Sequence, residues 1–340
     1  ALAQALSAAG IPGVIISLLC DGVLTAVSFA LMMVSFVFGI SLVFGFFEEI
    51  GYMARVSYAF DSTMSKIGLQ GKAVMPFLIS FGCNIGGVTG TRVIDSWGQR
   101  VTTMALSWVV PCAATWGVVG LVSSVFFGSQ GIFVVLSLFA AALLHMVITS
   151  KFFGKSLISE SDKSGLIMEL PPYRLPTLKN ISLHVWEKVK GFLVKAGTLI
   201  LAMSVLLWFL QAFDAGLNLV DSPEHSLLAL LAGAVAPIFA PLGFGDWRVS
   251  TALITGFMAK ESVVSSLTVL FGSTEALHSI LSMAGAASLL VFCLLYTPCV
   301  AAIASVKREL GGKWAVAMVI GQCVLAWIAA LAVYGIAGMM

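Results

Sequence analysis

A thiol and a carboxamide lie side by side where the apolar chain is interrupted by glycines. Cys83 and Asn84 occupy this interruption. A thiolate is a ligand for soft and borderline metals, and the amide of Asn84 adds a neutral oxygen. Three flanking glycines would let the backbone approach a ligand closely, namely Gly82, Gly86 and Gly87. The pattern predicts a metal site, and the alternative interpretation is a tight contact between two helices through small residues.

Two more thiols each follow a proline, in Pro111-Cys112 and Pro298-Cys299. A proline inside a helix lacks an amide donor and leaves a nearby carbonyl oxygen unpaired. Each pair therefore offers a thiol and an oxygen acceptor at one place in the chain. The alternative interpretation is a proline kink beside a buried cysteine, because free cysteine is ordinarily a small buried hydrophobe. The recurrence of the pair favours two further metal ligands.

A charged pair, Lys260-Glu261, stands inside the apolar segment Val249–Phe271. Ionisable residues within a membrane segment are costly and usually functional. We predict that Glu261 offsets the charge of a bound cation, and the alternative is that water solvates both charges at the membrane surface. The predicted metal ligands are Cys83, Asn84, Cys112, Cys299 and Glu261. The predicted pore or gating residues are Gly82, Gly86, Gly87, Pro111, Pro298 and Lys260.

The elements that position these residues are predicted to be transmembrane helices. Of the 340 residues, 59% are hydrophobic and only 10% are charged, whereas a soluble domain carries roughly a quarter charged residues. Apolar runs such as Val23–Phe47 and Ala315–Ala337 exceed the about 20 residues that cross a bilayer. We predict an all-α polytopic membrane protein that lies in a lipid bilayer.

The composition and the motifs exclude several classes of function. A net charge of +2 provides no basic face for a nucleic acid. Neither a phosphate-binding loop of the form G-x-x-x-x-G-K-[ST] nor an H-E-x-x-H zinc motif occurs in the sequence. We therefore predict that the chain is no enzyme and holds no permanent cofactor. The six cysteines lack the dense spacing of a secreted disulfide scaffold.

Charge also predicts which segments face which side of the membrane. The stretch Lys151–Lys195 holds eight of the 18 basic residues and four acids, so the positive-inside rule places it in the cytoplasm. Phe213–Asp246 carries four acids and neither Lys nor Arg, which is typical of an outer surface. We expect a multi-pass protein of the cytoplasmic membrane with a first half at 1–150, a cytoplasmic loop at 151–190 and a second half at 191–340.

A weak internal repeat relates the two halves. With a shift of 175 residues, Gly68-Leu69 falls on Gly243-Phe244, and Cys83-Asn84 falls on Met258-Ala259. One Pro-Cys pair then follows in each half. Each half is therefore predicted to contain an interrupted helix and then a proline-broken helix, and the two halves to be pseudo-symmetric. Paired interruptions at corresponding positions of two halves are the best indication of a transport site in a membrane protein.

Several motifs resemble the membrane region of FeoB, a family of bacterial ferrous iron transporters. The resemblance covers nearly the whole chain in the family's order and lies in Glu48–Arg55, Met64–Lys72, Phe81–Asn84, Met168–Pro176, Gly256–Val264, Leu294–Cys299 and Arg308–Gly311. It implies import of Fe(II) across the cytoplasmic membrane by two Gate repeats of opposed orientation. It also implies a cytoplasmic GTP-binding domain, through which alone GTP would act. Because the chain starts at Ala1, we expect this domain to have been cut away or never to have been present, and a GTP-binding domain in cis or in trans is the expected partner.

Two departures from the family's pattern leave the transported metal open. The family continues its Phe-Gly-Cys-Asn motif with Val-Pro-Ala, whereas this chain has Ile85-Gly86-Gly87. Beyond Cys112, Thr115 and Gly117 replace an Arg and a Pro of the family. Both changes fall at the predicted site, so Mn(II) is an alternative substrate to Fe(II). The alternative functions are a nucleoside transporter of the same fold and a membrane module that needs a GTPase partner. The oligomeric state stays open, a homo-oligomer included.

Overall fold

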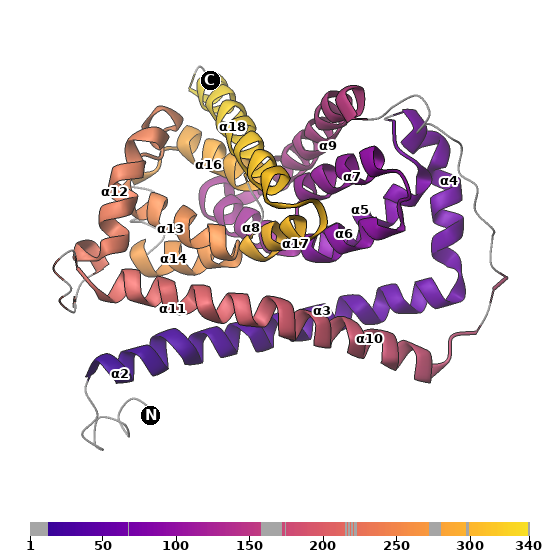
Figure 1. The fold of residues 1–340 in the computed structure, drawn as a ribbon. Helices are drawn as coiled ribbons and strands as arrows, with labels where there is room; N and C mark the ends of the chain where they lie inside the picture. The colour runs from indigo at the N-terminus through magenta and orange to yellow at the C-terminus, as the bar shows by residue number, and fades with distance from the viewer. Residues whose placement is uncertain are drawn as a thin grey trace.

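The computed structural model describes most of the chain, and every element in the described part is a helix (Figure 1). The described residues are 13–66, 68–157, 172–173, 175–214, 216, 218, 220, 223–271, 280–296 and 299–338. Several of the helices are long and apolar, which confirms the predicted all-α membrane fold. The predicted gating residue Pro298 lies outside the described residues.

Each half begins with a long helix that contains a short π-helical segment, continues with a series of shorter helices and ends with one long helix. The first half comprises α2 Gly13–Ser17, η1 Leu18–Leu24, α3 Thr25–Ile50, α4 Tyr52–Lys66, η2 Gly71–Ala73, α5 Val74–Gly82, α6 Asn84–Gly90, η3 Thr91–Val93, α7 Trp97–Val109, α8 Ala113–Phe127, η4 Gly128–Gln130 and α9 Gly131–Leu157. The second half comprises α10 Leu178–Phe192, η6 Leu193–Gly197, α11 Thr198–Ala212, η7 Pro223–His225, α12 Leu227–Phe239, η8 Ala240–Leu242, α13 Trp247–Met258, α14 Glu261–Phe271, α16 Met283–Leu295, α17 Val300–Leu310 and α18 Gly312–Ala337.

The helices α5 and α6 fold back on each other as a hairpin, here called hairpin 1. A Cβ atom added to Gly87 would lie 1.7 Å from Ser80 Oγ and 2.9 Å from the carbonyl oxygen of Pro76. Lys72 before the hairpin pairs with Asp95 after it at 2.8 Å. The two ends of hairpin 1 therefore lie together, and its tip is the break at Cys83.

The helices α13 and α14 form a second hairpin of the same kind, here called hairpin 2. Thr255 and Ser266 share a hydrogen bond of 2.9 Å between their hydroxyl oxygens, and the guanidinium of Arg248 lies 5.9 Å from the ring centre of Phe271. A pair of contacts so far apart in sequence is possible only if the two helices run antiparallel. Hairpin 2 follows α12 after a bend of 104°.

The tips of the two hairpins have the same backbone conformation, which confirms the internal repeat and corrects its register. Cys83 has φ −148° and ψ 123°, and Ala259 has φ −149° and ψ 122°. The predicted alignment paired Cys83 with Met258, so it was wrong by one residue at this point. The helix is also unwound only at Cys83, because Asn84 already begins α6. The structural counterpart of Asn84 is therefore Lys260.

Each half contains one proline-broken helix, and the second part of that helix packs against the other half. In the first half α7 and α8 are separated at Val110–Cys112, and in the second half α16 ends at Leu295 and α17 begins at Val300. Helix α8 packs against α14 and α16 of the second half, whereas α17 packs against α6 of the first half (Figure 1). Each half therefore completes the core of the other.

Five helices of the described residues are long and apolar enough to cross a membrane, or six if one bent pair counts as a span. Shorter apolar helices, among them Gly71–Gly82 and Glu261–Phe271, belong to the hairpins. They are not counted as crossings, because the two helices of a hairpin are antiparallel and enter and leave on one side. A glycine in the left-handed region precedes each hairpin, Gly68 with φ 81° and Gly243 with φ 82°. These turns set the direction in which the chain enters each hairpin.

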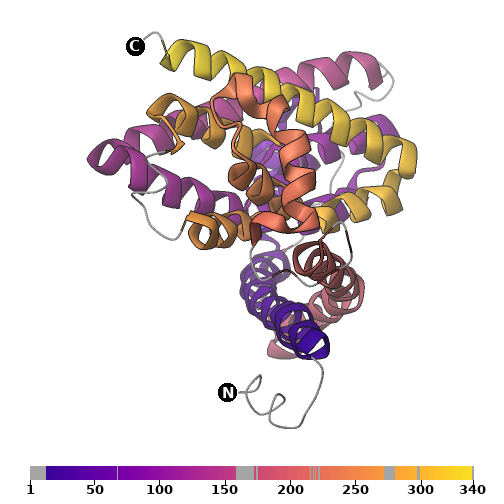
Figure 2. The ribbon, with the colours of Figure 1, turned by 90° about the vertical axis from the view of Figure 1, so that its left-hand side faces the viewer.

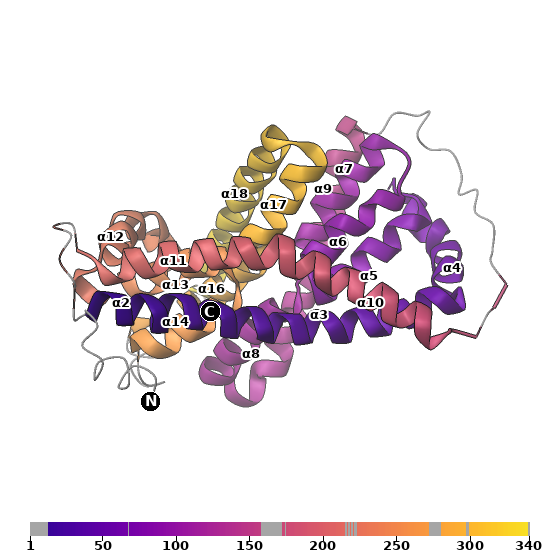
Figure 3. The ribbon, with the colours of Figure 1, turned by 60° about the horizontal axis from the view of Figure 1, so that its bottom comes forward.

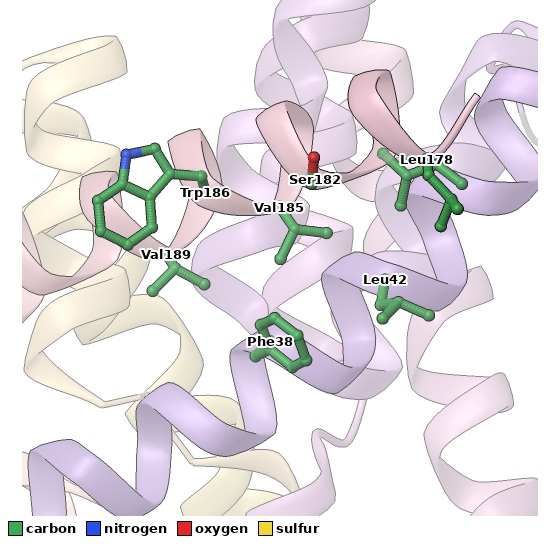
Figure 4. Close-up of a pocket in the computed structure, with 8 residues that line it drawn as sticks. Phe38, Leu42, Leu178, Ser182, Val185, Trp186 and Val189 are labelled. Atoms are coloured by element: carbon green, nitrogen blue, oxygen red, sulfur yellow. The ribbon is translucent and has the colours of Figure 1, made fainter. Parts of the chain in front are cut away.

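The first long helices of the two halves lie side by side along one face of the molecule (Figures 2 and 3). The carboxylate of Glu49 at the end of α3 accepts hydrogen bonds from the backbone of Thr177 and from Asn180 Nδ2 at the start of α10. Helix α10 therefore begins inside the predicted loop 151–190. A shallow groove of about 310 Å³ follows the pair and is lined mainly by apolar side chains, among them Phe38 and Trp186 (Figure 4). None of the predicted site residues lines this groove.

The close approach in hairpin 1 predicts that Gly87→Ala destabilises the protein. The added Cβ overlaps Ser80 Oγ, and overpacking of this kind typically costs about 1–3 kcal/mol. In hairpin 1 the glycine lies on the second helix, and in hairpin 2 it lies on the first helix, as Gly256 against Val263. One small residue is thus sufficient at each contact. We therefore expect Ser80→Gly to recover part of the stability that Gly87→Ala removes. Thermal unfolding in detergent measures both variants.

Gly90→Ala is the matched control for this experiment, because its Cβ would have its nearest neighbour at 3.6 Å, an ordinary contact. Equal unfolding temperatures for Gly87→Ala and Gly90→Ala would contradict the packing of hairpin 1.

Candidate metal site

Three cysteines each stand directly before a half-helix. Cys83 precedes α6, Cys112 precedes α8 and Cys299 precedes α17, and none of the three has a helical backbone conformation. The first N–H groups of a helix have no partner within it and carry partial positive charge. A thiolate at such a position is stabilised, and the thiolate is the form of cysteine that binds metals. The breaks therefore place each thiol beside backbone N–H groups that have no partner within the helix.

The tertiary structure brings these three cysteines into one region. The thiol of Cys83 interacts electrostatically with those of Cys112 and Cys299, although they come from three different segments of the chain. All three side chains are partly exposed, so none is sealed inside the apolar core. Within the residues that the structure describes, no three His, Cys, Asp or Glu side chains lie close enough together to hold a metal ion. The three thiols lie in one region in this conformation, and simultaneous ligation requires the tip of hairpin 1 and the breaks at Cys112 and Cys299 to move closer.

Asn84 lies at the same tip and is almost completely buried, with 4% of its surface exposed. Its Oδ1 atom accepts no hydrogen bond in the structure. A buried acceptor without a partner costs about 1–3 kcal/mol, which a bound cation would offset. The amide oxygen of Asn84 is therefore available as a neutral ligand beside Cys83.

Lys260 occupies the corresponding position of hairpin 2 and is also buried, with 5% of its surface exposed. Its Nζ atom donates a hydrogen bond of 3.3 Å to the carbonyl oxygen of Cys293 and lies 4.9 Å from the ring centre of Tyr296. The carbonyl belongs to the last turn of α16, where helix acceptors lack partners. Lys260 also interacts electrostatically with Cys112 and Cys299. The structure thus places the predicted gating lysine beside the predicted thiol ligands.

In the first broken span a side chain also pairs with a carbonyl oxygen that has no partner within its helix. Gln322 on α18 donates a hydrogen bond of 3.4 Å from Nε2 to the carbonyl oxygen of Trp108, in the last turn of α7. Pro111 follows three residues later, is buried and supplies no backbone N–H. In each span a polar side chain from elsewhere in the fold therefore donates to one carbonyl oxygen of the last helical turn before the break.

Glu261 opens α14 and is half-buried, with Oε1 unpaired in the structure. A carboxylate in the first turn of a helix interacts favourably with the helix dipole. The position is compatible with the predicted role of Glu261 beside a cation, and that role stays a prediction. The unwound Ala259 replaces a thiol here, so hairpin 2 contributes charge where hairpin 1 contributes sulfur.

The three predicted pore glycines have packing contacts. A Cβ on Gly82 would lie 2.4 Å from Ile40 Cδ1 on α3, and one on Gly86 would lie 2.6 Å from Ile79 Cγ2. With Gly87 against Ser80, all three positions require a small residue. The alternative interpretation of close helix contacts accounts for these glycines, and a further part in the pore stays a prediction.

Sequence reasoning missed Tyr296 and Cys293, which contact Lys260. Tyr296 is almost fully buried, its hydroxyl has no hydrogen-bond partner in the structure, and a Cβ on Gly256 would lie 2.7 Å from that oxygen. The available signal was the short run from Cys293 to Cys299, in which two thiols and a phenol flank a proline.

Comparisons with known proteins agree with this architecture. A model of the Gate family, described as "Nucleoside recognition", matches residues 30–128 and 193–313. A second model, "Ferrous iron transport protein B C terminus", matches residues 135–188. No solved structure matches the chain. The chain belongs to the Gate family, a class of membrane proteins with two related halves.

Within this class the chain corresponds to the membrane region of FeoB proteins. It is 35% identical to the Fe(2+) transporter FeoB of Methanocaldococcus jannaschii over 331 residues, and 32% identical to that of Staphylococcus aureus strain MSSA476 over 326 residues. Each match covers 94% of this chain and 49% of the relative. The chain thus spans about half the length of these relatives. A match of 33% identity to the Salmonella typhimurium Fe(2+) transporter FeoB covers 68% of this chain and 30% of the relative.

The proximity of Cys83 and Cys299 predicts a cross-link between the two halves. In a variant that keeps only these two cysteines, a short bifunctional maleimide should join hairpin 1 to α17. After proteolysis between residues 151 and 177, the two halves should migrate as one band in denaturing electrophoresis.

A variant that keeps only Cys20 and Cys299 is the control. Ile40 packs against the tip of hairpin 1, and Cys20 lies 20 residues earlier on the same helical stretch, about 30 Å along its axis. Separate bands for the Cys83–Cys299 variant, or joined bands for the control, would contradict the described site.

Proposed function

We propose that this chain forms the membrane pathway by which Fe(II) is imported across the cytoplasmic membrane. The FeoB relatives, which are named as Fe(2+) transporters, support ferrous iron as the substrate. The observation that carries the proposal is the meeting of three half-helix N-termini that each present a cysteine. Fe(II) is a borderline cation that accepts thiolate and neutral oxygen ligands, and this region supplies both.

In this proposal each residue of the site has a separate task. Cys83, Cys112 and Cys299 supply thiolates to the cation, and Asn84 supplies its unpaired amide oxygen. Glu261 adds negative charge on the side of hairpin 2. A cation that loses water on entry needs these charges, because desolvation of an isolated ion in a region of low dielectric is prohibitive.

Lys260 has the opposite charge and therefore a different task. Its ammonium group is held by the carbonyl oxygen of Cys293 and the ring of Tyr296, so it balances nearby negative charge when the site is empty. A cation that binds the thiolates takes over this balance. Lys260 thereby acts as a gating residue that responds to the occupied site.

The position of the hairpins supports a path that opens to each side in turn. The base of hairpin 1, opposite its tip, is marked by the contact of Lys72 with Asp95. The base of hairpin 2 is marked by the contact of Arg248 with Phe271. Because Cys83 at one tip and Lys260 at the other both interact with Cys112 and Cys299, movement of either hairpin would expose the site to one side of the membrane. A GTP-binding domain, in cis or as a partner, would act on this movement from the cytoplasm.

Removal of the thiol at the tip of hairpin 1 should impair uptake of Fe(II). We expect Cys83→Ser to lower the initial rate of radioactive iron uptake by about tenfold or more, since even residues that only support metal ligands contribute 10–100-fold. Cys20→Ser is the control, because Cys20 lies in η1 and is not among the proposed ligands. Unchanged uptake by Cys83→Ser would remove this residue from the site.

Competition experiments separate the substrate classes. Excess Mn(II) should reduce iron uptake if the site selects by ligand type alone, because the two ions share oxygen ligands and similar geometry. An excess of nucleosides should leave iron uptake unchanged. Inhibition by nucleosides would favour a nucleoside transporter instead, and the Gate model is described as "Nucleoside recognition".

Liposomes that contain only these 340 residues test whether the chain transports without a partner. We expect Fe(II) to enter such liposomes slowly and by the same path, so that Cys83→Ser abolishes the flux. Absence of flux, together with normal flux when a GTP-binding domain is added, would identify the chain as a module that depends on that partner.

A further inference from the structure

An ion cluster joins the two halves away from the thiols. Glu309, near the end of α17, accepts hydrogen bonds from Arg92 at 2.9 and 2.5 Å and a third from Arg100. Arg92 lies in η3 and Arg100 in α7, so both arginines belong to the first half. The side chain of Glu309 is only 7% exposed. We call these three residues the Glu309 clamp.

The Glu309 clamp stands at the far end of two half-helices that start at the site. Helix α6 begins after Cys83 and leads into η3, whereas α17 begins after Cys299 and ends beside Glu309. The two helices pack against each other. With 11 residues, α17 extends about 16 Å, so the clamp is separate from the thiols. We call the contact surface between α6 and α17 a seam. The clamp closes this seam on the side that carries Lys307 and Arg308, which the positive-inside rule assigns to the cytoplasm.

Among the described residues, which on α14 end at Phe271, the corresponding seam between α8 and α14 has no such ion cluster. Glu309 lies ten residues after Cys299, and Val122 lies ten residues after Cys112. Val122 is fully buried in an apolar cluster with Leu267 and Phe271 of α14. The pseudo-symmetry of the halves thus provides an internal comparison, in which one seam is apolar and the other is ionic.

Stability alone does not account for the ionic seam. A buried ion pair is often no more stabilising than the apolar residues that could replace it, and the seam at Val122 shows that such residues fit this fold. An ionic contact differs in how it opens, because water and cations can solvate its separated charges. The side chain of Arg92 is already 63% exposed, so its guanidinium remains hydrated when it releases Glu309.

We propose that the Glu309 clamp is the inner gate of the pathway. While Glu309 is held by both arginines, α6 and α17 are closed against each other and the thiols are shielded from the cytoplasm. When the carboxylate leaves the arginines, the seam opens and the thiols become accessible from that side. The role in iron release rests on the proposed function, whereas the control of access does not.

The rate at which Cys299 is modified tests the gate without any metal. The protein is the full chain with Cys299 as its only cysteine, and the probe is a membrane-impermeant cationic thiol reagent added to inside-out or right-side-out vesicles. We expect Glu309→Gln to raise the rate severalfold from the cytoplasmic side and to leave the rate from the outer side unchanged. An unchanged rate, or an equal rise from both sides, would overturn the proposal.

A control variant and a charge exchange are compared with Glu309→Gln. Asp95→Asn is the matched control, because it breaks an exposed ion pair on the same side and should leave the rate unchanged. Charge exchange by Arg92→Glu with Glu309→Arg should restore slow modification, since the new glutamate can pair with Arg100 and the new arginine. If Glu309→Gln does not accumulate as folded protein, Arg92→Gln replaces it with an expected intermediate rate, and a rate equal to that of the parent would refute the gate.

The outcome is independent of iron transport. A severalfold rise in cytoplasmic modification supports the gate even if Cys83→Ser leaves iron uptake unchanged. Conversely, loss of uptake in Cys83→Ser supports the site whether or not the clamp controls access.

Discussion

Every backbone break inside a bilayer must find hydrogen-bond partners within the protein, because lipid offers none. The described structure meets this demand by placing two hairpin tips and two broken spans against one another. Side chains complete the pairing, since Gln322 caps a carbonyl of α7 and Lys260 caps one of α16. Residues that begin the half-helices therefore meet where the breaks meet. The location of Cys83, Cys112 and Cys299 in one region is a consequence of this constraint.

The two halves share a backbone but differ in chemistry at corresponding points. The tip of hairpin 1 carries Cys83 and Asn84, whereas the tip of hairpin 2 carries Ala259 and Lys260 at the same dihedral angles. The seams differ in the same way, one closed by apolar side chains and the other by Glu309. A path that moves an ion in one direction needs two unlike sides, and pseudo-symmetry with unlike residues provides them.

Periodicity and composition predicted the elements well and their contacts poorly. Long apolar runs identified the membrane helices, because burial in lipid demands about 20 apolar residues in succession. The residues at the breaks were also recognisable, since glycine, proline and charge are conspicuous in apolar segments. The register at the hairpin tip was wrong by one residue, because weak identity between two apolar stretches does not distinguish neighbouring alignments. The roles of Gly82, Gly86 and Gly87 in packing required knowledge of Ile40, Ile79 and Ser80.

By itself, the sequence determined the all-α membrane class, the presence of two related halves and the residue types that interrupt them. These properties follow from local composition, to which each segment contributes independently. Only the tertiary structure decided that Cys83, Cys112 and Cys299 come together, that Asn84 corresponds to Lys260, and that Glu309 pairs with arginines of the other half. Such pairings join residues about 30 to more than 200 positions apart, and they arise from the exchange of α8 and α17 between the halves, which no local pattern encodes.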